Sequence, residues 1–554
     1  MRSGTISADR RPDCPPGPAT LAVGDDEGLA LGFKKKRSVN GGATLAPRTA
    51  PTTRQSEHSR IVHTEPGSLE RGSPQKRHGV YYTPDAVAAS LVKWAIRNET
   101  DRLLDPACGD GRFLAYHEKS IGIEQDFQAA SLAKERAPKA DVLSREFFSW
   151  AQGTDERFDC VVGNPPFIRY QTFRGETRKT ALELCATVGV AFSALTSSWA
   201  PFLVVASSLL RKGGRIAFVV PAEVGHAPYA APALKYLINH FARVQVIAIR
   251  EKIFAGLSED CWLLYAEGFG GRTDEIRLSS LDSFQPTLRP PSHFIRVSVT
   301  DWGTSWNQRL RPFLVPSAVR EIYSEIAQSP DTKRLGDVAK VGIGYVSGDN
   351  EFFHLRPSHA AKIGIPRAFL HPTVRNGRAL PKHRLTTEIV GAWYRADDPI
   401  LLLRIPKNIR EVPSSIQWYL GSEKGHRVRE GYKCRNRDPW YSVPDVRVPD
   451  FFLTYMSGRN PSLVQNLAGC TCTNALHAVR LTDHAHQALL VDAWKSPLTR
   501  LSCEIEGHPL GGGMLKLEPG EASSIILPST KARASFPEAI VEEGIAVMQS
   551  WRHY

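Results

Sequence analysis

The feature that most constrains the fold is a series of short apolar runs, several of which end in a polar residue. Three of these runs lead to Asp105, Glu124 and Asn164, and two more cover residues 215–220 and 244–249. Helix-like segments separate several of the runs, and we expect one of them to begin near Phe113. Short apolar strands that alternate with helices predict an α/β fold with a parallel sheet. Since ligands of such sheets bind at the carboxyl ends of the strands, we expect the three polar residues to share one site.

Composition and texture divide the 554 residues into three parts. Residues 1–75 are rich in Pro, Gly, Ser and Arg and show no lasting hydrophobic period, so we expect a disordered basic tail. The alternating runs place an α/β domain at residues 76–284. After residue 285 the alternation is lost, and short strand-like segments mix with Pro, Arg and aromatic residues, which predicts a mixed α+β domain at residues 285–554. The hydrophobic content of 42% suffices for large cores and excludes a wholly disordered chain.

Charge and cysteine content bear on partners and compartment. The formal net charge of +13 favours a polyanionic partner such as nucleic acid, without establishing one. The nine cysteines are odd in number and scattered, which is not a disulfide framework and indicates a reducing compartment. The chain opens with polar and basic residues and no apolar segment typical of a signal peptide. We therefore expect a cytoplasmic protein.

One segment of the sequence is a candidate metal site, and another is a candidate membrane span. Cys470 and Cys472 lie near His477, but no second pair with zinc-ligand spacing follows, so we expect no metal. Residues 185–210 carry no charge and are long enough to cross a bilayer. Because they contain several Ser and Thr residues together with Gly and Pro, we expect a buried helix and no membrane association.

The turn after the first strand has the composition of a nucleoside site. Small residues at Ala107, Gly109 and Gly111 let the backbone approach a ligand closely, and Glu124 at the end of the next strand suits ribose hydroxyls. The turn lacks the G-x-G-x-x-G pattern of dinucleotide sites, and Asp110 inside it disfavours an anion. S-adenosyl-L-methionine, an adenosine ligand with a positive sulfonium, fits this pattern better.

The third strand leads into Asn164-Pro165-Pro166-Phe167, whose residue types suit methylation of an exocyclic amine. The lone pair of such an amine is delocalised into the ring. The Asn164 amide oxygen and the Pro165 carbonyl can accept hydrogen bonds from its two N–H groups and point the lone pair at a methyl group. The prolines stiffen the loop, and Phe167 offers a stacking face.

In these motifs the chain resembles the gamma-class N6-adenine DNA methyltransferases of restriction–modification systems, which include TaqI-like enzymes. The resemblance rests on residues 82–84, 105–114, 124, 163–170, 212–215 and 220–221 in this order. It implies a class I S-adenosylmethionine-dependent methyltransferase domain of Rossmann-like fold at residues 76–284. A DNA target-recognition domain would follow at residues 285–554.

The resemblance also implies roles for individual residues. Thr83 would lie near the methionine carboxylate, and Asp105 belongs to the cofactor motif. Glu146 would contact the adenine of the cofactor, with Asp141 as the alternative, and Phe254 would stack on the flipped target base. DNA contacts would come from a basic patch of the C-terminal half that includes Arg427, Arg429, Lys433, Arg435 and Arg437.

These inferences predict a site-specific enzyme that methylates adenine N6 in double-stranded DNA. No nuclease cluster is recognisable before residue 82, so we expect protection against a separately encoded restriction endonuclease. Two alternatives stay open. Glutamine-N5 protein methyltransferases and RNA base methyltransferases share the Asn-Pro-Pro loop, and a catalytically inactive DNA-binding subunit would share the domain order.

Overall fold

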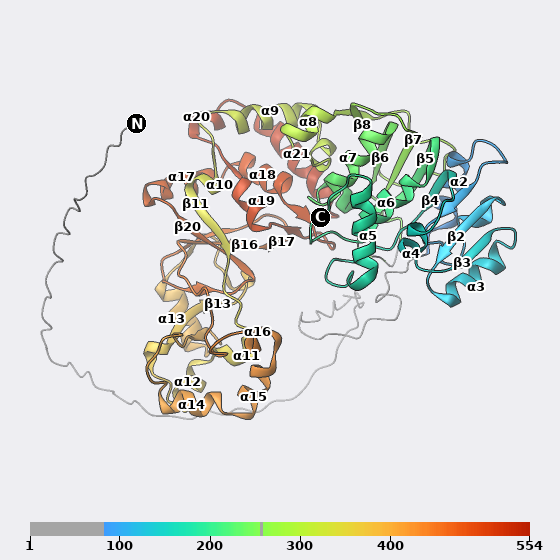
Figure 1. Ribbon diagram of the computed structural model, residues 1–554. Coiled ribbons are helices and arrows are strands. Elements are labelled where there is room, and N and C mark those ends of the chain that lie inside the picture. Colours follow the sequence, from blue (N-terminus) through green and yellow to red (C-terminus); the bar gives the residue numbers. More distant parts are fainter. Residues whose placement is uncertain (1–81, 255–256, 258) are drawn as a thin grey trace, which may run out of the picture. The chain divides into compact units, whose positions relative to one another are not determined.

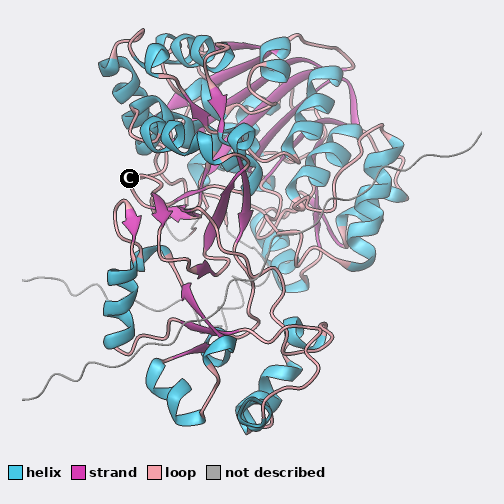
Figure 2. Ribbon diagram, turned by 90° about the vertical axis from the view of Figure 1, so that its left-hand side faces the viewer, coloured by secondary structure: helices cyan, strands magenta, loops and turns pink. Residues whose placement is uncertain are grey.

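The structure, a computed structural model, describes residues 82–254, 257 and 259–554. The predicted tail at residues 1–75 therefore lies outside the described residues. The first part of the described chain forms one nine-stranded sheet in the order β3-β2-β1-β4-β5-β7-β6-β8-β9 (Figures 1 and 2). Its strands are β1 (Leu103–Asp105), β2 (Ser120–Glu124), β3 (Asp141–Ser144), β4 (Phe158–Gly163), β5 (Leu210–Pro221), β6 (Phe241–Ile249), β7 (Cys261–Phe269), β8 (Glu275–Leu281) and β9 (Ile295–Ser298).

The sheet is mixed, whereas the sequence predicted a parallel one. Strands β1 to β5 pair in parallel, but β7 runs antiparallel to both β5 and β6. The sheet then continues through β8, parallel to β6, and through β9, antiparallel to β8. It thus extends to Ser298, beyond the boundary predicted at residue 284. The predicted α/β class is confirmed, and the reversed strands are an addition that the pattern of apolar runs did not indicate.

Helices cover both faces of this sheet. They are α2 (Asp85–Ala95), α3 (Phe127–Arg136), α4 (Phe147–Gln152), α5 (Gly175–Thr187), α6 (Trp199–Ser208) and α7 (Ala230–His240). Helices α2 and α3 pack on one face, and α4 to α7 pack on the other. The helix predicted to begin near Phe113 is wrong, because only a 3-10 turn forms there, Leu114–Tyr116.

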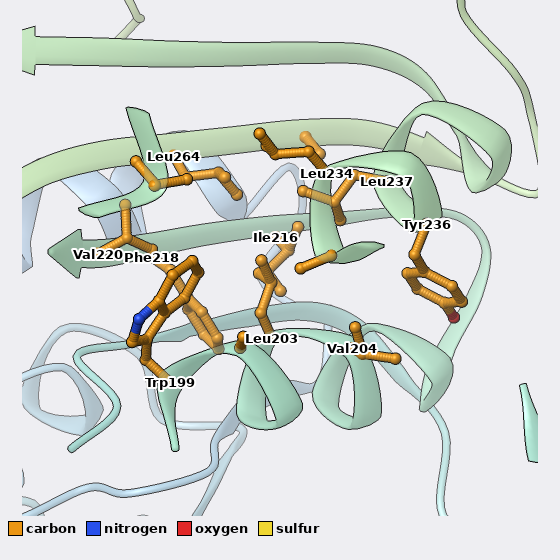
Figure 3. Close-up of a cluster of buried hydrophobic side chains, with 14 of the residues drawn as sticks. Trp199, Leu203, Val204, Ile216, Phe218, Val220, Leu234, Tyr236, Leu237 and Leu264 are labelled. Atoms are coloured by element: carbon orange, nitrogen blue, oxygen red, sulfur yellow. The ribbon is translucent and has the colours of Figure 1, made fainter. Parts of the chain in front are cut away.

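The larger core lies between α6, α7 and the central strands. Figure 3 shows Trp199 and Leu203 of α6 facing Phe218 of β5, with Leu234 of α7 and Leu264 of β7 above them. All five side chains are fully buried, and burial of each contributes roughly 1.5–3 kcal/mol.

The uncharged segment at residues 185–210 is divided between two helices. It covers the end of α5, a loop and the ten residues of α6, nine of which are buried. The buried helix that we expected is thus α6. Within the described residues, no helix is both long and apolar enough to cross a membrane.

After β9 the described chain builds four smaller sheets. Their orders are β10-β23, β11-β20-β16-β18-β14, β12-β15-β13-β19 and β17-β22-β21. The strands are β10 (Lys333–Arg334), β11 (Ala339–Ile343), β12 (His354–Leu355), β13 (Leu370–Val374), β14 (Arg384–Leu385), β15 (Leu401–Leu403), β16 (Phe451–Thr454), β17 (Met456–Ser457), β18 (Leu463–Asn466), β19 (Thr471–Cys472), β20 (Leu476–Leu481), β21 (His508–Pro509), β22 (Leu515–Lys516) and β23 (Ile526–Leu527).

Helices accompany these small sheets throughout. They are α8 (Val299–Thr304), α9 (Ser317–Gln328), α10 (Leu335–Val338), α11 (Asn350–Phe353), α12 (Pro357–Ile363), α13 (Thr387–Arg395), α14 (Ser414–Leu420), α15 (Glu423–Glu430), α16 (Tyr432–Arg435), α17 (Gln487–Ala493), α18 (Pro497–Glu506), α19 (Pro519–Ser524), α20 (Thr530–Arg533) and α21 (Glu538–Ser550). The mixed α+β character predicted after residue 285 is present, and it has hydrophobic clusters of its own.

Candidate active site

The carboxyl ends of β1, β2 and β4 meet beside one cavity of about 260 Å³. Register explains why, since Leu104 pairs with Ile121 of β2 on one side and with Val161 of β4 on the other. The residues that line the cavity include seven of those predicted from the sequence: Thr83, Ala107, Gly109, Glu124, Glu146, Asn164 and Pro166. The strand pattern thus brings the cofactor motif and the Asn-Pro-Pro loop to one place.

The two glycines of the turn have different roles. Gly109 has a positive φ of 53°, and its N–H donates to Oε2 of Glu124 at 3.0 Å. Gly111 has a φ of 80°, and a Cβ there would lie 2.8 Å from Cα of Ala133 in α3. Gly111 does not line the cavity. Gly111 is needed for the positive φ and for packing against α3, and its close approach to a ligand stays a prediction.

Glu124 is fixed in place before any ligand arrives. Its Oε1 accepts a hydrogen bond from the N–H of Asp126 at 2.8 Å, and its Oε2 accepts the one from Gly109. Burial raises the pKa of Glu124, while these two backbone N–H groups lower it. A carboxylate held in this way at the end of β2 can accept further hydrogen bonds from ribose hydroxyls.

Asp105 lies beneath the cavity and does not line it. It is fully buried, and its Oδ1 accepts a hydrogen bond from the N–H of Ala107 at 3.2 Å. Its Oδ2 has no hydrogen-bond partner among the described residues. Burial, together with the charges of Glu124 and Asp110, raises the pKa of Asp105 to about 8. The predicted role in cofactor binding would therefore be indirect, through the turn at Ala107.

An arginine that the sequence analysis did not single out connects the turn to the segment before α2. Arg112 donates to the carbonyl of Thr83 at 3.0 Å and to the carboxylate of Asp110 at 3.1 Å. Its guanidinium also lies 5.5 Å from the ring centre of Tyr82, which lines the cavity. Arg136 of α3 pairs with the same Asp110 carboxylate at 2.7 Å. The signal in the sequence was the position of Arg112 directly after the last glycine of the turn.

Glu146 lines the cavity and also caps a helix. Its two carboxylate oxygens accept hydrogen bonds from the N–H groups of Phe148 at 3.0 Å and Ser149 at 2.8 Å, so it caps the N-terminus of α4. The contact with the cofactor adenine stays a prediction. The alternative, Asp141, is the first residue of β3. It therefore lies at the amino end of that strand, away from the cavity, and does not line it.

A serine holds the Asn-Pro-Pro loop. The hydroxyl of buried Ser198 accepts a hydrogen bond from the N–H of Ile168 at 2.9 Å and donates one to the carbonyl of Pro166. The N–H of Ser198 in turn donates to the carbonyl of Ile168 at 3.0 Å. Sequence reasoning missed Ser198, because a serine inside an apolar segment carries no recognisable signal.

The two predicted aromatic faces are not in the cavity wall. Phe167 is half-buried between the two core clusters, and Phe254 is 7% exposed within the cluster beneath α2. Neither lines the cavity, and neither does Pro165. Stacking of a target base on Phe167 or Phe254 stays a prediction, and for Phe254 it requires the side chain to leave its packing.

The predicted DNA contacts fall into two groups. Arg427 and Arg429 of α15 are exposed, as are Lys433 and Arg435 of α16, whose charges lie 5.7 and 5.5 Å from the ring centre of Tyr432. Arg437 is half-buried and donates to the carbonyls of Val346 and Ser347, each at 2.6 Å. It therefore stabilises a neighbouring loop, and its guanidinium is occupied.

The cysteine pair considered as a metal site is part of the core. Cys470 and Cys472 are buried, and burial raises the pKa of both thiols to about 12. Nε2 of His477 is hydrogen-bonded to the carbonyl of Leu517. Across the described residues, no group of three His, Cys, Asp or Glu side chains has a geometry that could hold a metal ion.

Comparison with known proteins places both halves of the chain in one family. Residues 111–254 match the family model of the Eco57I restriction-modification methylase. Residues 307–545 match that of the C-terminal domain of the type II methyltransferase M.Eco57I. The chain is a type II restriction–modification methyltransferase of the Eco57I family.

Individual relatives match this chain over different lengths. The type II methyltransferase M.XamI of Xanthomonas campestris pv. amaranthicola is 22% identical over 534 residues, which cover 92% of this chain and 96% of M.XamI. The release factor glutamine methyltransferase of Chlorobaculum tepidum is 35% identical over 126 residues, 22% of this chain and 39% of that protein. The type IIL restriction-modification enzyme MmeI, solved in complex with DNA, shares the fold with a TM-score of 0.50, at 12% identity over 85% of this chain and 71% of MmeI.

The cavity suits the cofactor that an S-adenosylmethionine-dependent methyltransferase family implies. Its wall is balanced in charge, with three acidic side chains and three arginines: Asp110, Glu124, Glu146, Arg112, Arg145 and Arg174. Such a wall can hold a ligand that carries both cationic groups and a carboxylate, as S-adenosyl-L-methionine does. Ile123, Phe147 and Phe148 supply apolar surface for an adenine ring. The residues of this family member therefore fit S-adenosyl-L-methionine.

Proposed function

We propose that this type II DNA methyltransferase transfers a methyl group from S-adenosyl-L-methionine to N6 of an adenine that has left the DNA duplex. The observation that carries the proposal is the position of Asn164. It follows β4 directly, lines the cofactor cavity, and belongs to a loop that Ser198 fixes at two backbone positions.

The chemistry asks this loop to orient an amine. When bound, S-adenosyl-L-methionine supplies an electrophilic methyl group. The Asn164 amide oxygen and the Pro165 carbonyl accept hydrogen bonds from the two N–H groups of the target amine, so that its lone pair points out of the ring plane. The proton lost from the amine after transfer passes to solvent. The loop thus acts by positioning and electrostatics and requires no strong base.

We propose cofactor contacts for four of the residues predicted from the sequence. Glu124 would accept from the ribose hydroxyls, Thr83 would donate to the methionine carboxylate, and Ala107 and Gly109 would border the nucleoside. We propose DNA contacts for Arg427, Arg429, Lys433 and Arg435, whose exposed charges suit phosphates or guanine. Extrusion of the adenine costs a few kcal/mol, which contacts in the site offset.

The second candidate is transfer to a glutamine side chain. It is supported by the 35% identity between part of this chain and a glutamine methyltransferase. That resemblance covers 126 residues only, whereas the likeness to M.XamI extends over 534 residues, including the C-terminal half. We therefore favour DNA as substrate, with a separately encoded restriction endonuclease as the functional partner.

Label from methyl-tritiated cofactor tests the proposal. Unmethylated DNA is incubated with the purified chain and digested to nucleosides, which are then separated. We expect the label in N6-methyl-2′-deoxyadenosine. Asn164→Ala should lower kcat by about a thousandfold or more, since its hydrogen bond matters mainly in the transition state, while calorimetric cofactor affinity stays within about threefold. Label in N4-methylcytosine would contradict the adenine assignment, and label in protein would favour the second candidate.

A further inference from the structure

A second, strongly basic cavity lies on the nine-stranded sheet at the opposite ends of the strands from the cofactor cavity. It has a volume of about 700 Å³ and lies at the amino ends of β5, β6 and β8. Among the described residues that line it are six cationic side chains and a single carboxylate, Glu267. The six are Lys93, Arg97, Arg215, Arg243, Arg277 and Arg289. The cofactor cavity, by contrast, is at the carboxyl ends of the parallel strands.

The strand register fixes the floor of this basic cavity. Glu267 of β7 pairs in register with Arg215 of β5 on one side and with Arg243 of β6 on the other. Its carboxylate binds both guanidinium groups, that of Arg215 at 3.0 Å. Arg215 also donates to the carbonyl of Trp94 at 2.7 Å and lies 4.9 Å from the centre of that ring. These two cations are therefore held in place without a ligand.

The far wall is equally well ordered. The guanidinium of Arg277 donates to Glu275 at 3.0 Å and lies 4.7 Å from the ring centre of Phe294. The segment that carries Phe294 is attached to the sheet. Gln245 donates to the carbonyl of Pro291 at 2.8 Å, and Ser279 donates to the carbonyl of His293 at 2.9 Å.

The charges of the cavity remain unbalanced after these pairs are counted. Lys93, Arg97 and Arg289 are exposed, and no described carboxylate lies within ion-pair distance of any of them. Guanidinium groups already lie over Trp94 and Phe294. The cavity thus offers surplus positive charge and forked donors.

We propose that this cavity is a binding site for phosphate groups. Arginine forks bind phosphate oxygens bidentately, and several cations around one hollow attract a multivalent anion more strongly than a monovalent one. The site is distinct from the methyl-transfer site and does not depend on the function proposed for it. The phosphates come from either a free phosphorylated ligand or a nucleic-acid strand, because both present adjacent phosphate groups of the same chemistry.

Calorimetry with inorganic tripolyphosphate at low ionic strength tests the site. We expect binding to the wild-type chain and a loss of about tenfold or more in affinity for the double variant Arg97→Gln/Arg289→Gln. The control Lys362→Gln/Arg395→Gln removes the same charge from exposed positions outside the cavity and should bind tripolyphosphate as the wild type does. Methyl transfer by the double variant at saturating DNA should be unchanged, so that a failure here is independent of the active-site proposal.

A thymidine homopolymer of twelve nucleotides distinguishes the two sources of phosphate. If the double variant, but not its control, also loses affinity for the homopolymer, the site takes a nucleic-acid strand. If homopolymer affinity is the same in both variants, the site takes a free phosphorylated ligand. Absence of tripolyphosphate binding to the wild type, or an equal loss in the double variant and its control, would overturn the proposal.

Discussion

The two cavities at opposite ends of the strands of the nine-stranded sheet differ in charge balance. At the carboxyl ends of β1, β2 and β4, three acidic side chains and three arginines line the cofactor cavity, and the Asp105 carboxyl beneath it has a pKa raised to about 8. At the amino ends of β5 and β6, six cations surround a hollow with one carboxylate. The difference shows that the net charge of +13 is unevenly distributed over the molecule, so it need not serve one polyanionic partner. The sheet separates a charge-balanced cofactor cavity from a cavity with surplus positive charge.

The cofactor end of the sheet can be tested through Asp105, whose pKa is strongly shifted. The pKa of Asp105 is raised from 3.8 to about 8, so the folded state keeps a proton that the unfolded chain loses near pH 4. Folding is therefore penalised increasingly as the pH rises from about 4 to 8. Asp105→Asn removes this penalty, and the cofactor-free variant should be more stable than the wild type at pH 8, by up to the order of 5 kcal/mol. Thermal unfolding between pH 5 and 9 measures the difference. Parallel pH profiles for the two proteins would contradict it.

Matched substitutions of one carboxylate in each cavity sharpen the comparison. Glu124→Gln should weaken cofactor binding by about tenfold or more, because it removes a charged acceptor from the cavity wall. Glu267→Gln removes a bridging carboxylate from the basic cavity and should leave cofactor affinity unchanged. Calorimetric titration with S-adenosyl-L-methionine compares them. Equal losses would mean that the two cavities are not independent.

A smaller effect is expected from the residue that fixes the Asn-Pro-Pro loop. Ser198→Ala removes two hydrogen bonds to this loop and should lower kcat by about tenfold, with little change in cofactor affinity. Ser208→Ala is the control, since the Ser208 hydroxyl bonds only a carbonyl of its own helix at 2.7 Å. Steady-state methylation kinetics measure kcat for both variants and for the wild type. If both variants retain the wild-type kcat, Ser198 has no positioning role.

The parts of the fold that the sequence predicted are those set by local patterns. The apolar runs at β1, β2, β4, β5 and β6 were found, and so were the polar residues that follow three of them. Reversal of β7 and the addition of β8 and β9 depend on pairing between distant segments, which no local period reveals. The helix expected to begin near Phe113 is replaced by the 3-10 turn at Leu114–Tyr116.

Within the site, residue types were predictable and their partners were not. The motif located Glu124 and Asn164 at the cavity, because strand ends converge in an α/β sheet. It did not reveal that Gly111 serves packing against Ala133, or that Ser198, directly before the first residue of α6, holds the loop. Arg437 was predicted among the DNA contacts from charge alone, and only the structure shows its guanidinium bound to Val346 and Ser347.

Sequencing of modified bases in the DNA of a host that expresses this chain tests the central claim most directly. The account predicts N6-methyladenine at one defined sequence context in cells with the wild-type chain, and none at that context in cells with Asn164→Ala. Unmodified adenine in both strains, or the same modification in both, would contradict it.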